Sequence, residues 1–260
     1  AAAAIHQAAV EELFAGRITS GSEVSFDPAT GAVTASHGRR LGAILLSGGR
    51  DPEAGPADVE AALLEGDRAH GLGLLPWSEA ASALRQRAAF ARRFDAAIRD
   101  LSDAALVGRL DEWLPVLLQN RRRLSDVDPA ALAAALEALL GWDGRKAVER
   151  LAPGHFESPA GSRHPIDYAA EAGPTVTVRV QALFGLRDHP TVAGGRMPLV
   201  LALTSPAGRP IQTTRDLPGF WRGSWKDVAR EMRGRYPKHP WPDDPASAPP
   251  TLRTKKAGGG

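Results

Sequence analysis

Proline and glycine, which occur 21 and 27 times in 260 residues, constrain this chain most because both interrupt regular structure. They cluster at Ser47 to Pro56, at Ala152 to Gly154, and in six prolines between Pro237 and Pro250. These breaks, with the patterns between them, predict four consecutive regions: residues 1–50, 57–152, 153–235 and 236–260.

The first region carries the pattern of a short helix followed by three strands. The helix is predicted to span residues 5–14. Glu23 to Phe26 and Ala32 to Ala35 flank a Pro/Gly turn and predict a β-hairpin. The apolar run from Leu41 to Leu46 predicts a third strand that is buried.

The second region, residues 57–152, shows helical periodicity. Its apolar residues recur three and four positions apart, behind Ser102 and behind Asp128-Pro129, which are typical helix starts. We expect four to six helices packed as a bundle. Arg121 to Arg123 falls at a predicted helix end, where cations stabilise the helix dipole. Contact with phosphate is the alternative interpretation of these three arginines.

The third region, residues 153–235, predicts a small antiparallel sheet that a helix closes. Thr175 to Gln181 alternates as a strand, Leu199 to Leu203 and Pro210 to Thr213 predict a further hairpin, and Arg163 to Ala169 is a further candidate strand. The prolines beyond residue 236 preclude regular structure. We therefore expect an extended, Pro-rich tail that wraps a surface or is mobile.

The closing helix, residues 221–233, has two faces. One is apolar: Trp221, Trp225, Val228 and Met232. The other is cationic: Arg222, Lys226, Arg230 and Arg233. Ser224 and Asp227 match a capping box. Two interpretations stay open, an ordinary amphipathic helix with a solvated basic face or a surface that contacts phosphate.

Charge is distributed unevenly along the chain. Residues 220–260 carry nine Lys or Arg against four Asp or Glu, a net of +5, so the rest carries −3 of the total of +2. A cationic end on a nearly neutral body suits a polyanionic partner.

Several function classes lack their motifs in this sequence. None of the five lysines follows a glycine, so the phosphate-binding loop Gly-x-x-x-x-Gly-Lys-Ser/Thr is absent, and so is Asp-Glu-x-His. His155, His164 and Asp167 lack the spacing of a ligand set. We therefore expect no catalytic residues, no ATP hydrolysis and no metal site.

The composition sets further bounds. No cysteine is present, which excludes disulfides and thiolate metal sites. No window approaches 18 apolar residues, so we expect no membrane span and a cytoplasmic protein.

A long irregular motif near the end of the chain consists of two runs. They are Arg215-Asp-Leu-Pro-Gly-Phe-Trp221 and Gly234-Arg-Tyr-Pro-Lys-His-Pro-Trp-Pro-Asp-Asp-Pro245. With Gly195-Arg-Met-Pro-Leu-Val-Leu-Ala-Leu203, it resembles the C-terminus of the HrpB family of bacterial DEAH-box ATP-dependent helicases. The resemblance implies that residues 1–50 are the back half of an oligonucleotide/oligosaccharide-binding (OB) barrel, although three strands are too few to close one. It also implies that ATP and magnesium bind only in motor domains that this chain does not contain.

Resemblance and charge together imply an α+β accessory region, with a partial OB-like element, a helical bundle and a small antiparallel β domain. It would bind single-stranded nucleic acid, with RNA as the first candidate and DNA as the other, beside the motor domains. The candidate contacts are Arg39, Arg40, Arg163, His164, Arg222, Lys226, Arg230, Arg233, Arg235, Tyr236, Lys238 and His239. The alternative is a structural brace that packs on the helicase core without contacting nucleic acid.

Overall fold

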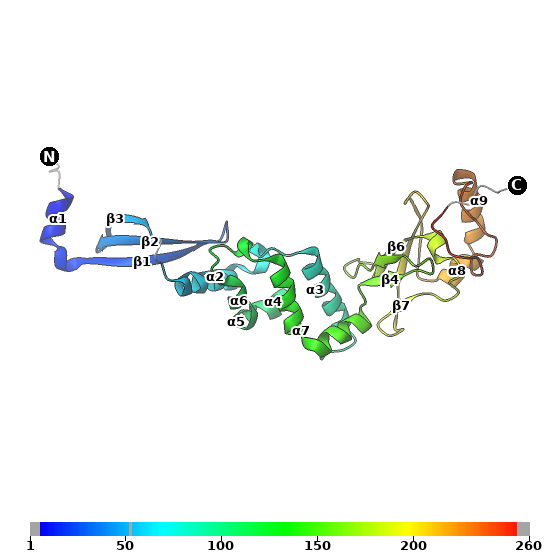
Figure 1. Ribbon diagram of the computed structural model, residues 1–260, viewed down its shortest axis with the longest axis horizontal. Helices are drawn as coiled ribbons and strands as arrows, with labels where there is room; N and C mark the ends of the chain where they lie inside the picture. The colour runs from blue at the N-terminus through cyan, green and yellow to red at the C-terminus, as the bar shows by residue number, and fades with distance from the viewer. Residues whose placement is uncertain (1–5, 52–53, 254–260) are drawn as a thin grey trace. The chain divides into compact units, whose positions relative to one another are not determined.

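The computed structural model describes residues 6–51 and 54–253, which divide into two compact units (Figure 1). Unit 1 spans Ala1–Ser82 and Leu101–Leu139, and unit 2 spans Ala83–Asp100 and Leu140–Gly260. Two helices, α3 (Glu79–Arg92) and α7 (Pro129–Leu151), therefore contribute residues to both units. Gly141 interrupts α7 with a φ of 67°, which glycine adopts at low cost.

Unit 1 begins with an antiparallel sheet in the order β1-β2-β3. It follows α1 (Gln7–Leu13) and η1 (Ala15–Arg17), and its strands are β1 (Ile18–Asp27), β2 (Ala32–Leu41) and β3 (Ile44–Arg50). The hairpin that the sequence predicts is present and longer than expected, with Ile18 opposite Leu41. Asp27 fixes its turn by accepting bonds from the Ala29 amide at 2.9 Å and the Thr30 hydroxyl at 2.7 Å.

The prediction that the third strand is buried is wrong. Ile44 and Leu45 are 63% and 56% exposed. Apolar composition predicts burial only where another layer covers the strand, and in the described part of the chain β3 is an edge strand that pairs with β2. The sheet is consistent with a partial OB element, but membership of such a barrel stays a prediction.

Helices fill the rest of unit 1, as the periodicity predicts. The remaining elements are α2 (Pro56–His70), η2 (Leu72–Leu74), α4 (Asp103–Val107), α5 (Leu110–Trp113), α6 (Pro115–Leu118) and η3 (Leu124–Asp126). Ser102 caps α4 by accepting a hydrogen bond from the Ala105 amide at 3.4 Å. Leucines with no more than 1% exposure form the core: Leu63, Leu106, Leu110, Leu114, Leu118, Leu124, Leu132 and Leu136.

Unit 2 contains a three-stranded sheet in the order β10-β9-β6. Its strands are β6 (Thr175–Arg179), β9 (Val200–Thr204) and β10 (Pro210–Thr214), and η4 (Val180–Leu183) follows β6. β9 and β10 form the predicted antiparallel hairpin. β6 instead pairs with β9 in parallel, which corrects the expectation of a purely antiparallel sheet. Alternation identifies a strand but not the direction of its partner.

Two small antiparallel pairs complete the strands of unit 2. They are β4 (His155–Glu157) with β5 (Arg163–Pro165), and β7 (Thr191–Val192) with β8 (Met197–Pro198). The candidate strand at Arg163 to Ala169 thus forms only over its first three residues. Mixed helix and sheet in separate segments makes the described chain α+β.

The predicted closing helix is in fact two helices, α8 (Leu217–Arg222) and α9 (Trp225–Arg235). Gly223 lies between them with non-helical φ and ψ of −98° and −100°. The predicted capping box is wrong, because Ser224 makes no cap bond and its hydroxyl donates to Gln212 at 3.0 Å. Asp216 caps α8 by accepting from the Gly219 amide at 2.9 Å.

An aromatic cluster around Trp225 holds α8 and α9 in place. Trp225 has no exposed surface, and its ring lies 5.3 Å from Trp221, 5.5 Å from Phe184 and 6.1 Å from Trp241. Val228 is only half-buried, so the apolar face is narrower than predicted. In the part of the chain that the structure describes, no helix is long and apolar enough to cross a membrane.

Residues 236–253 contain no helix or strand and lie back against α9 (Figure 1). The Trp225 indole donates to the Pro242 carbonyl at 2.9 Å, and Arg233 donates to the Trp241 carbonyl at 2.8 Å. The Trp241 indole in turn donates to the Tyr236 carbonyl at 3.0 Å. Two side-chain donors of α9 therefore fix this segment on the helix, and a third bond lies within the segment.

Candidate nucleic-acid interface

The exposed side of α9 and the end of α8 form a cationic surface, here called the α9 surface. It consists of Arg222, Lys226, Arg230, Arg233 and Arg235, all exposed. The opposite side of α9 buries Trp225, Ala229 and Met232. Lys226, Arg230 and Arg233, spaced four and three residues apart along α9, therefore face solvent together.

Three of the five cations of the α9 surface are paired with carboxylates. Arg230 lies 3.1 Å from Asp227, Arg233 lies 3.5 Å from Asp243, and Arg235 lies 2.9 Å from Glu231. Such exposed pairs contribute about 0–1 kcal/mol, so a phosphate can replace the carboxylate at little cost. Arg222 and Lys226 make no ion pair within residues 6–51 and 54–253.

An open hollow of about 400 Å³ lies beside this surface. Its lining residues are Trp225, Lys226, Ala229, Arg230, Arg233, Pro242 and Asp243. Three cations and one carboxylate therefore surround an apolar floor. The Trp225 ring already packs on four other aromatic rings, so it is not available to stack on a base.

The three candidates that follow α9 differ in how far they are engaged. Lys238 is exposed and makes no ion pair with any described residue. Tyr236 is half-buried, and its hydroxyl accepts a hydrogen bond from Ser205 at 3.3 Å. The His239 ring lies edge-on to the Tyr236 ring at 6.4 Å. Of these three, Lys238 has the geometry of a phosphate contact.

Arg163 and His164 lie in β5, in the same unit as the α9 surface. His164 shares a hydrogen bond of 2.9 Å with Ser162, which is 2.8 Å from Ser158. Burial lowers the pKa of His164 below its ordinary value of 6.5, so the ring is neutral at physiological pH. Arg163 is exposed, with a guanidinium nitrogen 3.4 Å from a ring nitrogen of His155.

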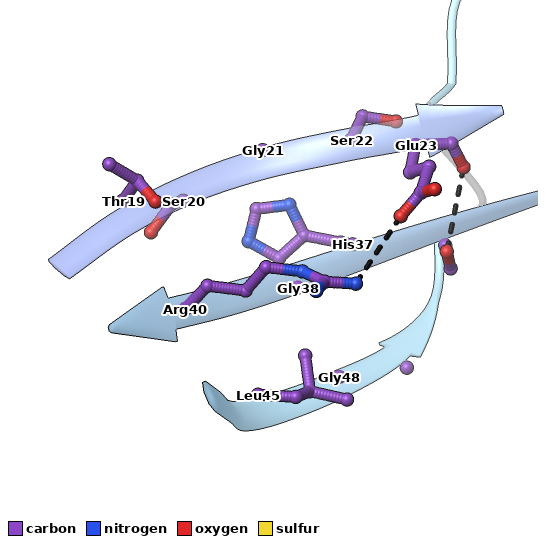
Figure 2. A pocket seen from close by; sticks show the side chains of 12 residues that line it. Thr19, Ser20, Gly21, Ser22, Glu23, His37, Gly38, Arg40, Leu45 and Gly48 are labelled. Atoms are coloured by element: carbon purple, nitrogen blue, oxygen red, sulfur yellow. Dashed lines mark hydrogen bonds and ion pairs between the residues drawn. The ribbon is translucent and has the colours of Figure 1, made fainter. Parts of the chain in front are cut away.

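Arg39 and Arg40 lie on β2 in unit 1, and both are ion-paired. Arg39 contacts Glu11 at 2.9 Å, and Arg40 contacts Glu23 at 3.5 Å. Figure 2 shows Arg40 and Glu23 turned toward one another across the sheet, at an open hollow of about 420 Å³. The Arg40–Glu23 pair is exposed like those of the α9 surface, so a phosphate can replace its carboxylate at little cost, whereas Glu11 is only 25% exposed.

Sequence reasoning missed two features. Asp67 of α2 is completely buried, a placement that its helical position alone does not reveal. Arg121 to Arg123 stays undecided in the sequence, because only the fold shows what surrounds the three arginines. Across the described residues, no three His, Cys, Asp or Glu side chains gather closely enough to hold a metal ion.

Comparisons with known proteins agree with one another. A family model described as ATP-dependent helicase C-terminal matches residues 113–245. The chain is 39% identical over 237 residues to the ATP-dependent RNA helicase HrpB of Escherichia coli K12, an alignment that covers 90% of this chain and 29% of that protein.

Two crystal structures are similar to the fold. That of the E. coli DExH-box NTPase HrpB matches with a TM-score of 0.74 and 34% identity, over 96% of this chain and 31% of that one. That of the E. coli DEAH/RHA helicase HrpB matches with a TM-score of 0.64 and 33% identity, over 86% and 29%. The chain thus spans less than a third of these relatives. It belongs to the HrpB family of ATP-dependent helicases, of which it represents the C-terminal region.

Proposed function

We propose that this chain is a non-catalytic accessory region of an HrpB-like helicase that binds single-stranded nucleic acid, RNA in the first instance, beside the motor domains. The observation that carries the proposal is the α9 surface, where Arg222 and Lys226 are exposed and unpaired beside a cation-lined hollow. The name of the E. coli relative, an ATP-dependent RNA helicase, supports RNA as the ligand.

The geometry favours recognition of the nucleic-acid backbone over recognition of bases. Binding of single strands combines phosphate neutralisation with stacking of bases on aromatic rings. The tryptophans next to the α9 surface, Trp221, Trp225 and Trp241, are at most 7% exposed and cannot supply stacking. We therefore expect binding that depends weakly on sequence and steeply on salt.

A second function, a structural brace against the motor domains, has one observation in its favour. Unit 1 exposes four large apolar side chains near its sheet: Leu13, Phe14, Ile44 and Leu45. Exposed apolar side chains of this kind are typical of surfaces that pack against protein. The brace involves residues other than the α9 surface, so the two functions are separable by mutation.

Charge reversal tests the binding function directly. The triple variant Arg222→Glu, Lys226→Glu, Arg230→Glu removes three phosphate contacts and leaves the buried face of α9 intact. The affinity for labelled single-stranded RNA is expected to fall. The slope of log affinity against log salt should flatten by about 2, because each single-strand contact contributes roughly 0.7. Fluorescence anisotropy across a salt series measures both.

The matched control reverses three exposed arginines elsewhere in unit 2, namely Arg150, Arg187 and Arg209. The control makes the same change in net charge. If the α9 surface contacts phosphate, the α9 variant must lose more RNA affinity and more of the salt slope than the control does. An unchanged slope in a variant with the parent's melting temperature would remove the α9 surface from the interface. If the parent chain itself binds no RNA at low salt, the brace is the remaining function.

A further inference from the structure

Four arginines of unit 1 form a second cationic surface, here called the arginine edge: Arg50, Arg121, Arg122 and Arg123. All four are exposed. Arg50 is the last residue of β3, and the other three follow α6. Asn120 turns the chain between them with a φ of 58°, a left-handed conformation that asparagine tolerates well.

Stabilisation of a helix dipole does not account for the three consecutive arginines. The preceding helix, α6, has only four residues and no basic residue in its last turn. The segment instead contacts the start of β2 through an isolated antiparallel bridge. The Val33 amide donates to the Arg122 carbonyl at 2.8 Å, and Ala32 forms an antiparallel bridge with Arg123. The backbone is therefore fixed, while the side chains face solvent.

Two neighbouring hollows meet at this surface, and Arg122 lines both. The larger, of about 410 Å³, is lined by Ala32, Val33, Thr34, Ala35, Arg50, Asp51, Arg122 and Arg123. The smaller, of about 190 Å³, is lined by Ala54, Pro56, Val59, Asn120, Arg121 and Arg122. Asp51 is the one acidic residue among these lining residues.

Among the described residues that line the two hollows, the four arginines of the arginine edge outnumber the single carboxylate of Asp51. Within residues 6–51 and 54–253, none of its four guanidinium groups forms an ion pair. Arg39 and Arg40 of the adjoining sheet, by contrast, are both paired with glutamates. Like charges that line neighbouring hollows repel one another, and a bound anion relieves that repulsion. Guanidinium groups suit phosphate in particular, because their planar donors bind it in a bidentate manner.

The hollows lack what an apolar protein partner requires. The described residues with large, exposed apolar side chains are Leu13, Phe14, Ile44, Leu45, Val116, Trp142 and Leu252. None of these lines either hollow. Protein interfaces are centred on buried aromatic or aliphatic anchors, so the composition of this surface favours a polyanion.

We propose that the arginine edge is a second binding site for the phosphates of a single-stranded nucleic acid. The inference rests on the proposed function and deepens it, because it assigns unit 1 a phosphate contact of its own. The site reads the backbone: the arginines neutralise consecutive phosphates, and the Thr34 hydroxyl and Asn120 amide line the same hollows as additional hydrogen-bonding groups.

The test uses the whole chain and a labelled oligouridylate of about 12 nucleotides, a length within the site sizes of single-strand binders. Arg121→Gln, Arg122→Gln, Arg123→Gln removes three charges without adding bulk. We expect affinity at low salt to fall about tenfold and the salt slope to flatten by about 2. The Arg→Lys triple variant should keep the parent's slope and lose only part of the affinity, since it keeps the charge but not the bidentate geometry.

The matched control removes three charges elsewhere in unit 1, by Gln substitution of Arg17, Arg68 and Arg109. If the Arg121–Arg123 variant stays folded and has the parent's slope, the inference is wrong, whatever else the surface binds. The α9 variant separates the two proposals. A flattened slope in the α9 variant alone leaves the proposed function standing, and an unchanged slope in both variants overturns the two together.

Discussion

Asp67 is the residue whose placement is least expected. It lies on α2 with no exposed surface, and neither carboxylate oxygen has a hydrogen-bond partner in the described part of the chain. Burial raises its pKa from 3.8 to about 7. A charged carboxylate without a partner is costly inside a protein, so the folded chain retains the proton to near-neutral pH.

Stability should therefore fall as the pH rises. Between pH 4 and 7 the folded state holds a proton that the unfolded state has released, so the free energy of unfolding decreases across that window and levels off above it. Asp67→Asn should remove this dependence and exceed the parent by up to about 4 kcal/mol at pH 8, while near pH 4 the two converge. Urea denaturation at both pH values measures the difference. Parallel pH profiles would contradict the assignment.

Trp225 is expected to be the largest single contributor to the packing of α9. Trp225→Ala should cost roughly 3–5 kcal/mol, as large-to-small core changes do, because the ring is fully buried among four others. Trp142→Ala is the matched control, since Trp142 is 64% exposed and should change stability by about 0.5 kcal/mol or less. Chemical denaturation of the two variants checks this, and a loss of about 0.5 kcal/mol or less for Trp225→Ala would show that α9 is peripheral.

At the scale of elements, the local sequence pattern predicted where helices and strands form, because contacts between nearby residues largely determine them. Helical periodicity located α2 to α7, and alternation located β6, β9 and β10. It did not predict the parallel pairing of β6 with β9, because residues far apart in sequence determine that pairing. It also missed the break at Gly223, where the same apolar period continues across two helices.

The same limit applies to the candidate site. The sequence shows every cation, but not which carboxylate lies beside it. Arg39 pairs with Glu11, which is 28 positions away, and Arg233 with Asp243 across a turn. Arg121 to Arg123 looks like a helix end in the sequence, and only the structure shows that an isolated bridge joins Arg123 to Ala32 of β2. The sequence therefore identifies which residues are cationic, but not which of them are left without a carboxylate partner.

The exposure of β3 leads to a prediction for that strand. Ile44→Thr keeps a β-branched residue in the strand and removes an apolar side chain that is already 63% exposed, so stability should change by about 0.5 kcal/mol or less. Val176→Thr is the control, because Val176 on β6 is fully buried and a hydroxyl there should cost about 1–3 kcal/mol. Thermal or urea denaturation of both variants decides. A large loss for Ile44→Thr would mean that β3 is covered.

For the whole molecule, catalysis is the sharpest expectation. No lysine follows a glycine anywhere in the sequence, so the chain has no loop of the usual kind to seat the phosphates of ATP. Purified chain should release no phosphate from ATP, with or without RNA, in a coupled assay. Turnover of even about 1 per second, at the low end of typical enzymes, that persists after contaminating ATPases are removed would refute this.

The interleaving of the two units has a consequence for synthesis on the ribosome. The segment Ala83–Asp100 of unit 2 emerges before Leu101–Leu139 of unit 1. It therefore cannot pack with the rest of its own unit until residues beyond Leu139 have been synthesised. About 25 further residues must be synthesised after β6 before its parallel partner β9 is available to pair. The Trp225 indole likewise has no acceptor until Pro242 has been synthesised. At 5–20 residues per second, roughly, these delays last seconds. The nascent chain exposes the unpaired edge of β6 until β9 has emerged, and an unfinished aromatic cluster until residue 242 has emerged. Both are features that chaperones bind.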